Sequence, residues 1–91
     1  GKSQRYFRTS QGGRYIDQFI NGMAYESKVG SVKLTEFVSK QVTKDVELMA
    51  SGQVDSVSWV FFRSPVTGEI GPSEALYQLL VQNGISVFFV P

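Results

Sequence analysis

Hydrophobic and polar positions alternate in two different patterns along the first half of the chain. Residues 14–20 and 23–29 are rich in aromatic and β-branched residues, which favours strands, and Asn21-Gly22 between them is typical of a two-residue type I′ turn. Residues 34–50 then switch to apolar positions spaced by three or four, which predicts an amphipathic helix. Its apolar stripe contains Leu34, Phe37, Val38, Val42, Val46 and Met49.

The second half of the chain predicts a strand, a helix and a strand. Residues 55–63 end in a nearly continuous apolar run, which indicates a central strand. A second helix is capped by Ser73 or Gly71 and ended by Gly84, and residues 85–90 form a last buried strand. We expect the aromatic side chains of these strands to be core residues rather than a base-stacking platform: Trp59, Phe61, Phe62, Phe88 and Phe89.

The predicted element order is β-β-α-β-α-β. A strand joined to the next strand through a helix is normally its parallel neighbour, because such crossovers are right-handed. Ninety-one residues are enough for one domain with a single core. We therefore expect residues 1–91 to form one α/β domain, with a mixed central sheet of about four strands flanked by helices.

Composition restricts the chemistry that the chain can perform. It contains no cysteine and no histidine, which excludes disulfides, thiolate zinc sites, cysteine nucleophiles and any imidazole base. The remaining reactive groups are carboxylates, lysine, tyrosine and arginine, and their natural metal partners are oxygen-ligated ions such as Mg²⁺ or Mn²⁺. No apolar run approaches the roughly 20 residues of a membrane span.

Charge is distributed unevenly, although the net charge is only +1. Residues 1–14 carry Lys2, Arg5, Arg8 and Arg14 and no acidic residue. We interpret residues 1–13 as a basic N-terminal arm, for which two roles are open. The arm either follows phosphates and stacks on a base, with Arg8 and Arg14 as nucleic-acid contacts, or it is a solvated terminal segment.

Hairpin pairing brings two acidic residues together. The two-residue turn sets Asp17 opposite Glu26 and Tyr15 opposite Lys28, with both acids and the lysine on one face. Like charges directly opposite each other are destabilising, and a divalent cation held by the two carboxylates would explain their position. The alternative is a solvated face, on which Lys28 relieves the repulsion between the acids.

These residues resemble a known motif. Asp17, the triplet Glu26-Ser27-Lys28 and Gln41 on the following helix are similar to the site of the PD-(D/E)XK, or restriction-endonuclease-like, nuclease superfamily. The similarity extends over residues 14–90. A more specific similarity is to the toxin domains at the C-termini of bacterial polymorphic toxins. It lies in the segment "ESKVG" and in the loop that contains "TG" and "GPS". The resemblance implies metal-dependent hydrolysis of phosphodiester bonds.

The resemblance also implies a role for each residue. Asp17 and Glu26 would hold a divalent metal, Mg²⁺ in the first place and Mn²⁺ or Zn²⁺ as alternatives, with the backbone carbonyl of Ser27 as a further ligand. Lys28 would activate water or stabilise the transition state. Gln41 is open to two interpretations: it orients Lys28 or a phosphate, or it is an edge residue of the apolar stripe.

Partners follow from the same resemblance. They are nucleic acid, with DNA as the first candidate and RNA as the alternative, and a cognate immunity protein; Lys44 is a further candidate for a phosphate contact. The protein would be a secreted or cell-surface-delivered effector that acts in the cytoplasm of a target cell. Two other functions are open: a non-enzymatic binding module on a degenerate nuclease fold, and a DNA repair or junction-resolving nuclease.

Overall fold

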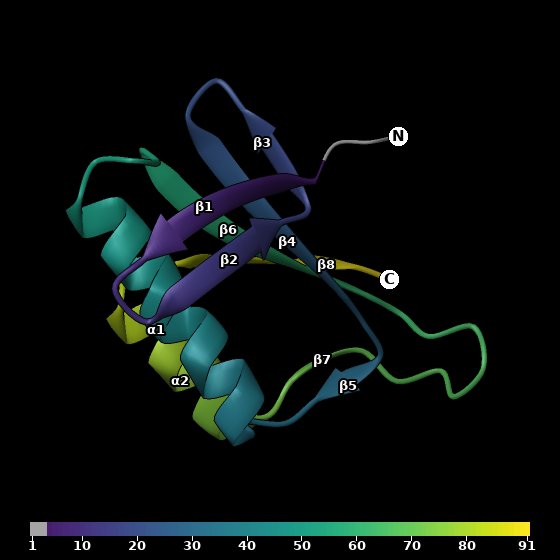
Figure 1. Cartoon of the computed structure of the whole chain (residues 1–91). Coiled ribbons are helices and arrows are strands. Elements are labelled where there is room, and N and C mark those ends of the chain that lie inside the picture. The colour runs from purple at the N-terminus through teal and green to yellow at the C-terminus, as the bar shows by residue number, and fades with distance from the viewer. Residues whose placement is uncertain (1–3) are drawn as a thin grey trace.

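A central sheet of four strands organises the protein (Figure 1). The computed structural model describes residues 4–91. Strand β3 (Gln18–Ile20) pairs antiparallel with β4 (Met23–Val29), and β4 pairs parallel with β6 (Ser56–Phe62). Strand β8 (Ser86–Val90) pairs parallel with β6 and forms the far edge. The expected α/β architecture with a mixed four-stranded sheet is confirmed.

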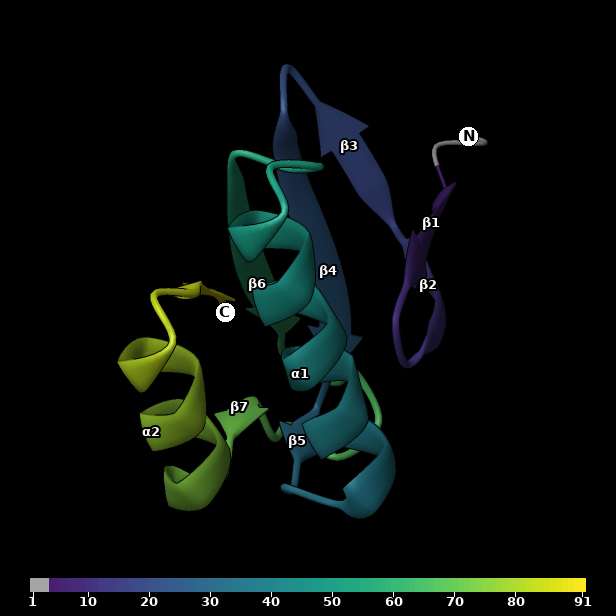
Figure 2. The same ribbon diagram turned by 60° about the vertical axis from the view of Figure 1, so that its left-hand side comes forward.

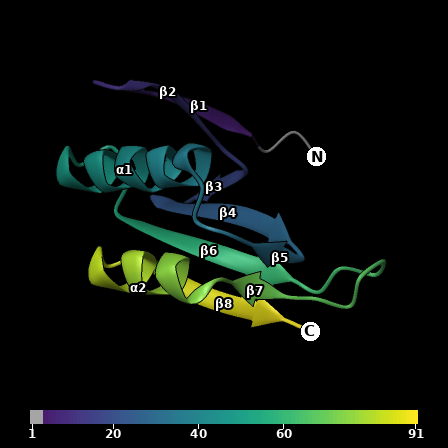
Figure 3. The same ribbon diagram turned by 90° about the horizontal axis from the view of Figure 1, so that it is seen from below.

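Both helices cover the same face of this sheet (Figure 3). Helix α1 (Glu36–Ala50) connects β4 to β6, and α2 (Glu74–Gln82) connects β6 to β8. Two crossovers of the same hand that advance in the same direction place their helices on one side. The hydroxyl groups of Thr35 and Ser73 accept hydrogen bonds from the first turns of α1 and α2, so Ser73 is the cap of the second helix.

The first predicted strand is interrupted, which corrects the expected hairpin. Strand β2 (Gly12–Ile16) pairs with β1 (Arg5–Thr9), the chain bends at Asp17, and only β3 pairs with β4. The predicted turn is confirmed, because both turn residues have the positive φ that a type I′ turn requires. The predicted register is confirmed for the three residue pairs of β3 and β4. The predicted pairing of Tyr15 with Lys28 is wrong, since Tyr15 pairs with Tyr6.

The N-terminal segment is therefore part of the folded structure. Residues 4–13 of the predicted basic arm include β1 and the beginning of β2, whereas residues 1–3 lie outside the described residues. Figure 2 shows the β1–β2 hairpin beside α1, on the side away from α2. The Phe7 ring packs edge-on against Phe19 of β3 at 5.2 Å, which joins the hairpin to the central sheet. A small parallel pair, β5 (Ser31–Val32) with β7 (Gly71–Pro72), lies near the start of α2.

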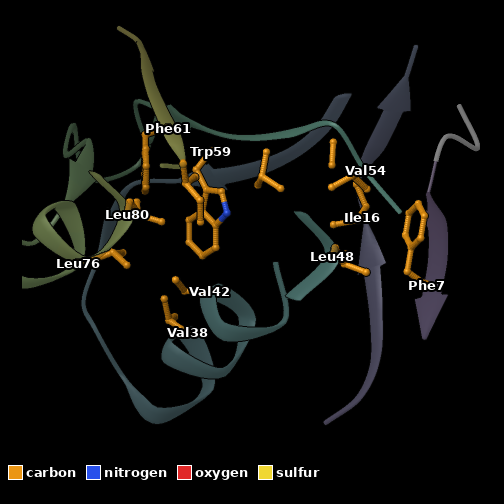
Figure 4. Packing of buried hydrophobic residues seen from close by; sticks show 13 residues of the cluster. Phe7, Ile16, Val38, Val42, Leu48, Val54, Trp59, Phe61, Leu76 and Leu80 are labelled. Atoms are coloured by element: carbon orange, nitrogen blue, oxygen red, sulfur yellow. The ribbon is translucent and has the colours of Figure 1, made fainter. Parts of the chain in front are cut away.

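The core lies between the sheet and its two helices. Trp59 and Phe61 point from β6 toward the helices, and Trp59 approaches Val38 and Val42 of α1 (Figure 4). Strand alternation explains this, because residues two apart on β6 face the same side. The buried hydrophobic residues are Phe7, Ile16, Ala24, Val38, Val42, Leu48, Val54, Val57, Trp59, Phe61, Leu76, Leu80 and Ile85.

Two expectations about apolar residues are wrong. Phe88 and Phe89 are 52% and 51% exposed rather than core residues, because β8 is an edge strand and its outer side has no neighbour among residues 4–91. Phe37 belongs to the predicted apolar stripe of α1 but is 70% exposed. In the described part of the chain, neither helix is long and apolar enough to cross a membrane.

Packing of α2 gives a direct test of this core. Leu80→Ala should lower the free energy of unfolding by about 2–5 kcal/mol, because Leu80 is fully buried and the truncation leaves a cavity. Val81→Ala is the matched control: Val81 is 49% exposed on the same helix, so its truncation should change stability by about 0.5 kcal/mol or less. Urea denaturation measures both, and equal losses would contradict the described orientation of α2.

Candidate active site

A cavity of about 280 Å³ opens between β2, β4 and the first half of α1. It is concave and mixed in character, because charged groups line it together with aromatic rings. The lining residues are Gln4, Gly13, Arg14, Tyr15, Asp17, Glu26, Phe37, Gln41 and Lys44. Most of the residues that the sequence singles out for a nuclease site are therefore brought to one place.

Lys28 does not line this cavity, but it contacts two residues that do. Its Nζ atom lies 3.2 Å from Glu26 Oε2 and donates a hydrogen bond to Gln41 Oε1 at 2.7 Å. It also lies 5.2 Å from the centre of the Trp59 ring. The contact with Gln41 agrees with the interpretation in which this glutamine orients the lysine. Strand β4 and helix α1 thus fix the ammonium group from two sides.

Asp17 reaches the site from the bend between β2 and β3. Its Oδ2 atom accepts a hydrogen bond from the backbone N–H of Ser27 at 2.8 Å. Asp17 is not a member of the β3–β4 ladder, which ends at the pair Gln18–Tyr25, so the expected direct opposition to Glu26 is replaced by this side-chain contact. The two carboxylates are still close enough for the charge of Asp17 to raise the pKa of Glu26.

Glu26 is an acidic residue in an unfavourable position. It is 5% exposed, and its burial raises the pKa of the carboxyl group above the ordinary value, against the opposing effect of Arg14 and Lys28. Arg14 Nη2 lies 3.3 Å from Glu26 Oε1. Oε1 is buried, and apart from this ion pair it has no hydrogen-bond donor among residues 4–91. A cavity-lining carboxylate oxygen with a free lone pair can accept a cation.

A buried ion pair lies beside Glu26. Arg14 donates hydrogen bonds to Asp45 from Nε at 2.8 Å and from Nη2 at 3.3 Å, and Trp59 Nε1 donates to Asp45 at 2.9 Å. The burial of Arg14 lowers its pKa, but Asp45 and Glu26 outweigh this effect, so that the pKa of the guanidinium group is raised. Arg14 therefore stays charged, although it is only 5% exposed.

Sequence reasoning placed Arg14 among surface contacts and missed Asp45. Arg14 points inward because residues of β2 alternate between the two faces of the hairpin, and Ile16 on the same face is also buried. The signal for Asp45 was present. It follows Val38 by seven residues and Val42 by three, which places a carboxylate within the buried stripe of α1. An acid in such a stripe indicates a buried partner.

The other predicted contacts lie at different distances from the site. Lys44 lines the cavity and its Nζ atom donates to the backbone carbonyl of Gly13 at 3.0 Å. Arg8 lies exposed on β1, where its carbonyl accepts a hydrogen bond from Gln53, and it is outside the cavity. Lys44 is thus placed to meet a ligand in the cavity, whereas Arg8 is placed to meet only a longer ligand that extends beyond it.

Comparisons with known proteins identified no relative of the chain. No family model, no curated protein and no solved structure matches the chain. The side chains that meet at the cavity, and the chemistry that such groups perform, are therefore the basis for a functional conclusion.

Asp45→Asn tests whether the buried ion pair holds the site together. The change keeps the shape of the side chain but removes the closer of the two carboxylates that compensate the buried guanidinium group of Arg14, the other being Glu26 at 3.3 Å. We expect a loss of about 3–5 kcal/mol in the free energy of unfolding. Glu36→Gln is the control, because its pairing with Lys40 on the same helix is exposed and has a distance of 4.0 Å. Denaturant titration distinguishes them, and similar values for both would contradict this role of Asp45.

Proposed function

We propose that this protein is a metal-dependent nuclease of the PD-(D/E)XK type, which hydrolyses phosphodiester bonds of nucleic acid. The observation that carries the proposal is that Asp17, Glu26 and Gln41 line one cavity, and that Lys28 contacts both Glu26 and Gln41. These residues come from a bend, a strand and a helix. On a solvated hairpin face, by contrast, the acids and the lysine would be exposed and would not contact a residue of α1.

The donor set fits a hydrated magnesium ion. In the described part of the chain, no group of three or more acidic, histidine or cysteine side chains could enclose a metal. Magnesium, however, is usually bound by one or two carboxylates, with waters and substrate phosphates as the other ligands. Asp17 and Glu26 would supply the carboxylates, Glu26 through Oε1, which receives no hydrogen bond from the described residues, and the carbonyl of Ser27 is the proposed further ligand. Mn²⁺ has the same ligand preference, whereas Zn²⁺ prefers nitrogen and sulfur ligands.

The side chains divide the reaction between them. A bound metal would supply a water molecule of lowered pKa and would neutralise charge on the phosphate. Lys28 is fixed by Glu26 and Gln41 with its charge next to the acids, where it stabilises the negative charge that develops on the phosphate. Its orientation before substrate binding removes part of the reorganisation that the transition state would otherwise require.

The proposed biological setting rests on the resemblance of "ESKVG" and the following loop to polymorphic toxin domains. In that setting the protein is the toxic module of a delivered effector, DNA is its first candidate substrate, and a cognate immunity protein binds it in the producing cell. A specific observation favours a second candidate, the binding module. Both oxygens of Glu26 lie within 3.3 Å of a cation, Arg14 or Lys28, so the chain's own cations already compensate part of its charge without a metal.

Glu26→Gln separates the nuclease from the binding module. In wild type, Mg²⁺ at 100 times its Kd should stabilise the fold by about 2.7 kcal/mol, and the variant should lose this gain together with cleavage. In chelator the variant should be at least as stable as wild type, because burial disfavours the charged carboxylate. Paired thermal melts and plasmid or RNA cleavage assays, with each metal and with chelator, measure these effects. A fully active Glu26→Gln would eliminate the nuclease site.

The same variant has a defined pH dependence. The pKa of Glu26 is raised in the folded state, so the folded protein binds the proton more tightly than the unfolded chain. Wild type should therefore lose stability relative to Glu26→Gln as the pH rises from the ordinary value of 4.5 through the raised value. A stability difference that is independent of pH in this range would contradict the burial of an ionisable Glu26.

Lys28→Ala tests the proposed transition-state role. Turnover should fall by about 100- to 1000-fold, as is typical when one group that stabilises developing charge is removed, and magnesium should still raise the melting temperature. Lys40→Ala is the matched control, because Lys40 lies beside Gln41 on α1 but its side chain is 65% exposed. Cleavage rates of the two variants at saturating substrate concentration test whether Lys28 acts in the transition state. Unchanged turnover in Lys28→Ala would remove this lysine from the mechanism.

A further inference from the structure

Two exposed aromatic residues line the cavity, one from each of its main walls. Phe37 belongs to the first turn of α1 and is 70% exposed, and Tyr15 belongs to β2 and is 58% exposed. Large exposed aromatic rings at a cavity indicate a ligand more strongly than isolated surface hydrophobic residues do. The Tyr15 ring is also supported from behind, because it packs against the Tyr6 ring with centroids 4.9 Å apart. These rings have no assigned part in the hydrolysis proposed above.

Two charged groups of the site are much less exposed than these rings. Glu26 is 5% exposed, and the Lys28 side chain is 17% exposed. In an uninterrupted duplex the bases are stacked and paired inside the helix, so it cannot offer a base face to the exposed rings without local unpairing. A single strand bends freely and can place one nucleotide in the cavity, with its base turned out of the stack.

A nucleotide matches this combination of groups in one molecule. Its phosphate suits the ammonium group of Lys44 at the cavity, whereas its base offers a flat π surface to the aromatic rings. A protein partner would also be attracted by exposed aromatic residues. It would not, however, need the acids and lysine beside them.

We propose that the cavity binds an unpaired nucleotide whose base stacks on Phe37, with Tyr15 as a second stacking surface. The substrate is then single-stranded or locally unpaired nucleic acid rather than continuous duplex. This inference rests on the proposed nuclease function and narrows its substrate class. Stacking on an aromatic face is tolerant of base identity, so discrimination is by strand pairing rather than by sequence.

The test is a binding measurement that needs no catalysis. Fluorescence anisotropy in chelator, at one fixed salt concentration, compares a labelled DNA strand of about 12 nucleotides with the same strand in a duplex. Wild type should bind the single strand at least about tenfold more tightly than the duplex. Phe37→Ala should weaken single-strand binding by roughly 5- to 150-fold, the usual range for loss of one base–aromatic contact, and leave duplex binding unchanged.

Two further variants separate stacking from folding and from general hydrophobicity. Phe37→Tyr keeps the π face and should bind the single strand within about twofold of wild type, whereas Phe37→Leu should bind as weakly as Phe37→Ala. Phe88→Ala is the matched control, since Phe88 is a 52% exposed aromatic on the far edge strand and its loss should change nothing. Melting temperatures of all variants exclude unfolding as the cause.

The outcomes distinguish this inference from the function on which it rests. Equal affinity for single strand and duplex, or unchanged single-strand binding by Phe37→Ala, would overturn the inference. Phe37 and Tyr15 would then be interpreted as contacts for a protein partner. Duplex cleavage in magnesium as fast as single-strand cleavage would overturn it while leaving the nuclease intact. Conversely, aromatic-dependent binding of the single strand without any metal-dependent cleavage would support the nucleotide site and overturn the nuclease.

Discussion

The buried ion pair between Arg14 and Asp45 is the interaction on which the site depends. It joins the β1–β2 hairpin to α1, and the hydrogen bond from Trp59 to Asp45 extends the connection to the central sheet. Ionised groups in the interior are tolerated only when each has its partner, because desolvation of an unpaired charge is strongly unfavourable. The hairpin is therefore attached to α1 in a defined position, and the cavity between them acquires fixed walls.

This ion pair also determines the electrostatics of the neighbouring carboxylate. The guanidinium group that Asp45 holds is directed at Glu26, and Lys28 approaches the same carboxylate from the other oxygen. Without these cations the burial of Glu26 would favour its neutral form even more strongly. A buried acid that is only partly compensated is unfavourable for folding, and such groups concentrate at functional sites. This feature is one that the proposed catalytic role would explain.

A bend in the chain is the second requirement of the site. If residues 14–20 formed one continuous strand, β2 would continue the antiparallel pairing with β4, and Asp17 would be one of the paired residues. The bend instead releases β2 to pair with β1, and it turns the carboxylate of Asp17 onto the backbone N–H of Ser27. The same change brings Tyr15 to the wall of the cavity and leaves its ring exposed. One local deviation thus accounts for both the acidic and the aromatic parts of the site.

Local information in the sequence determined the turn at Asn21-Gly22, the register next to it, both helices and the parallel order of the later strands. Each of these depends on residues close together in the chain or on the handedness of one crossover. Spacing also placed Glu26 and Lys28 on one face of their strand. The tertiary structure alone decided that Arg14 is buried against Asp45 and that the last strand is an exposed edge. The choice of Arg14 as the partner of Asp45 depends on a segment thirty-one residues away, and the exposure of the last strand depends on which strands and helices cover it, and no local pattern encodes either.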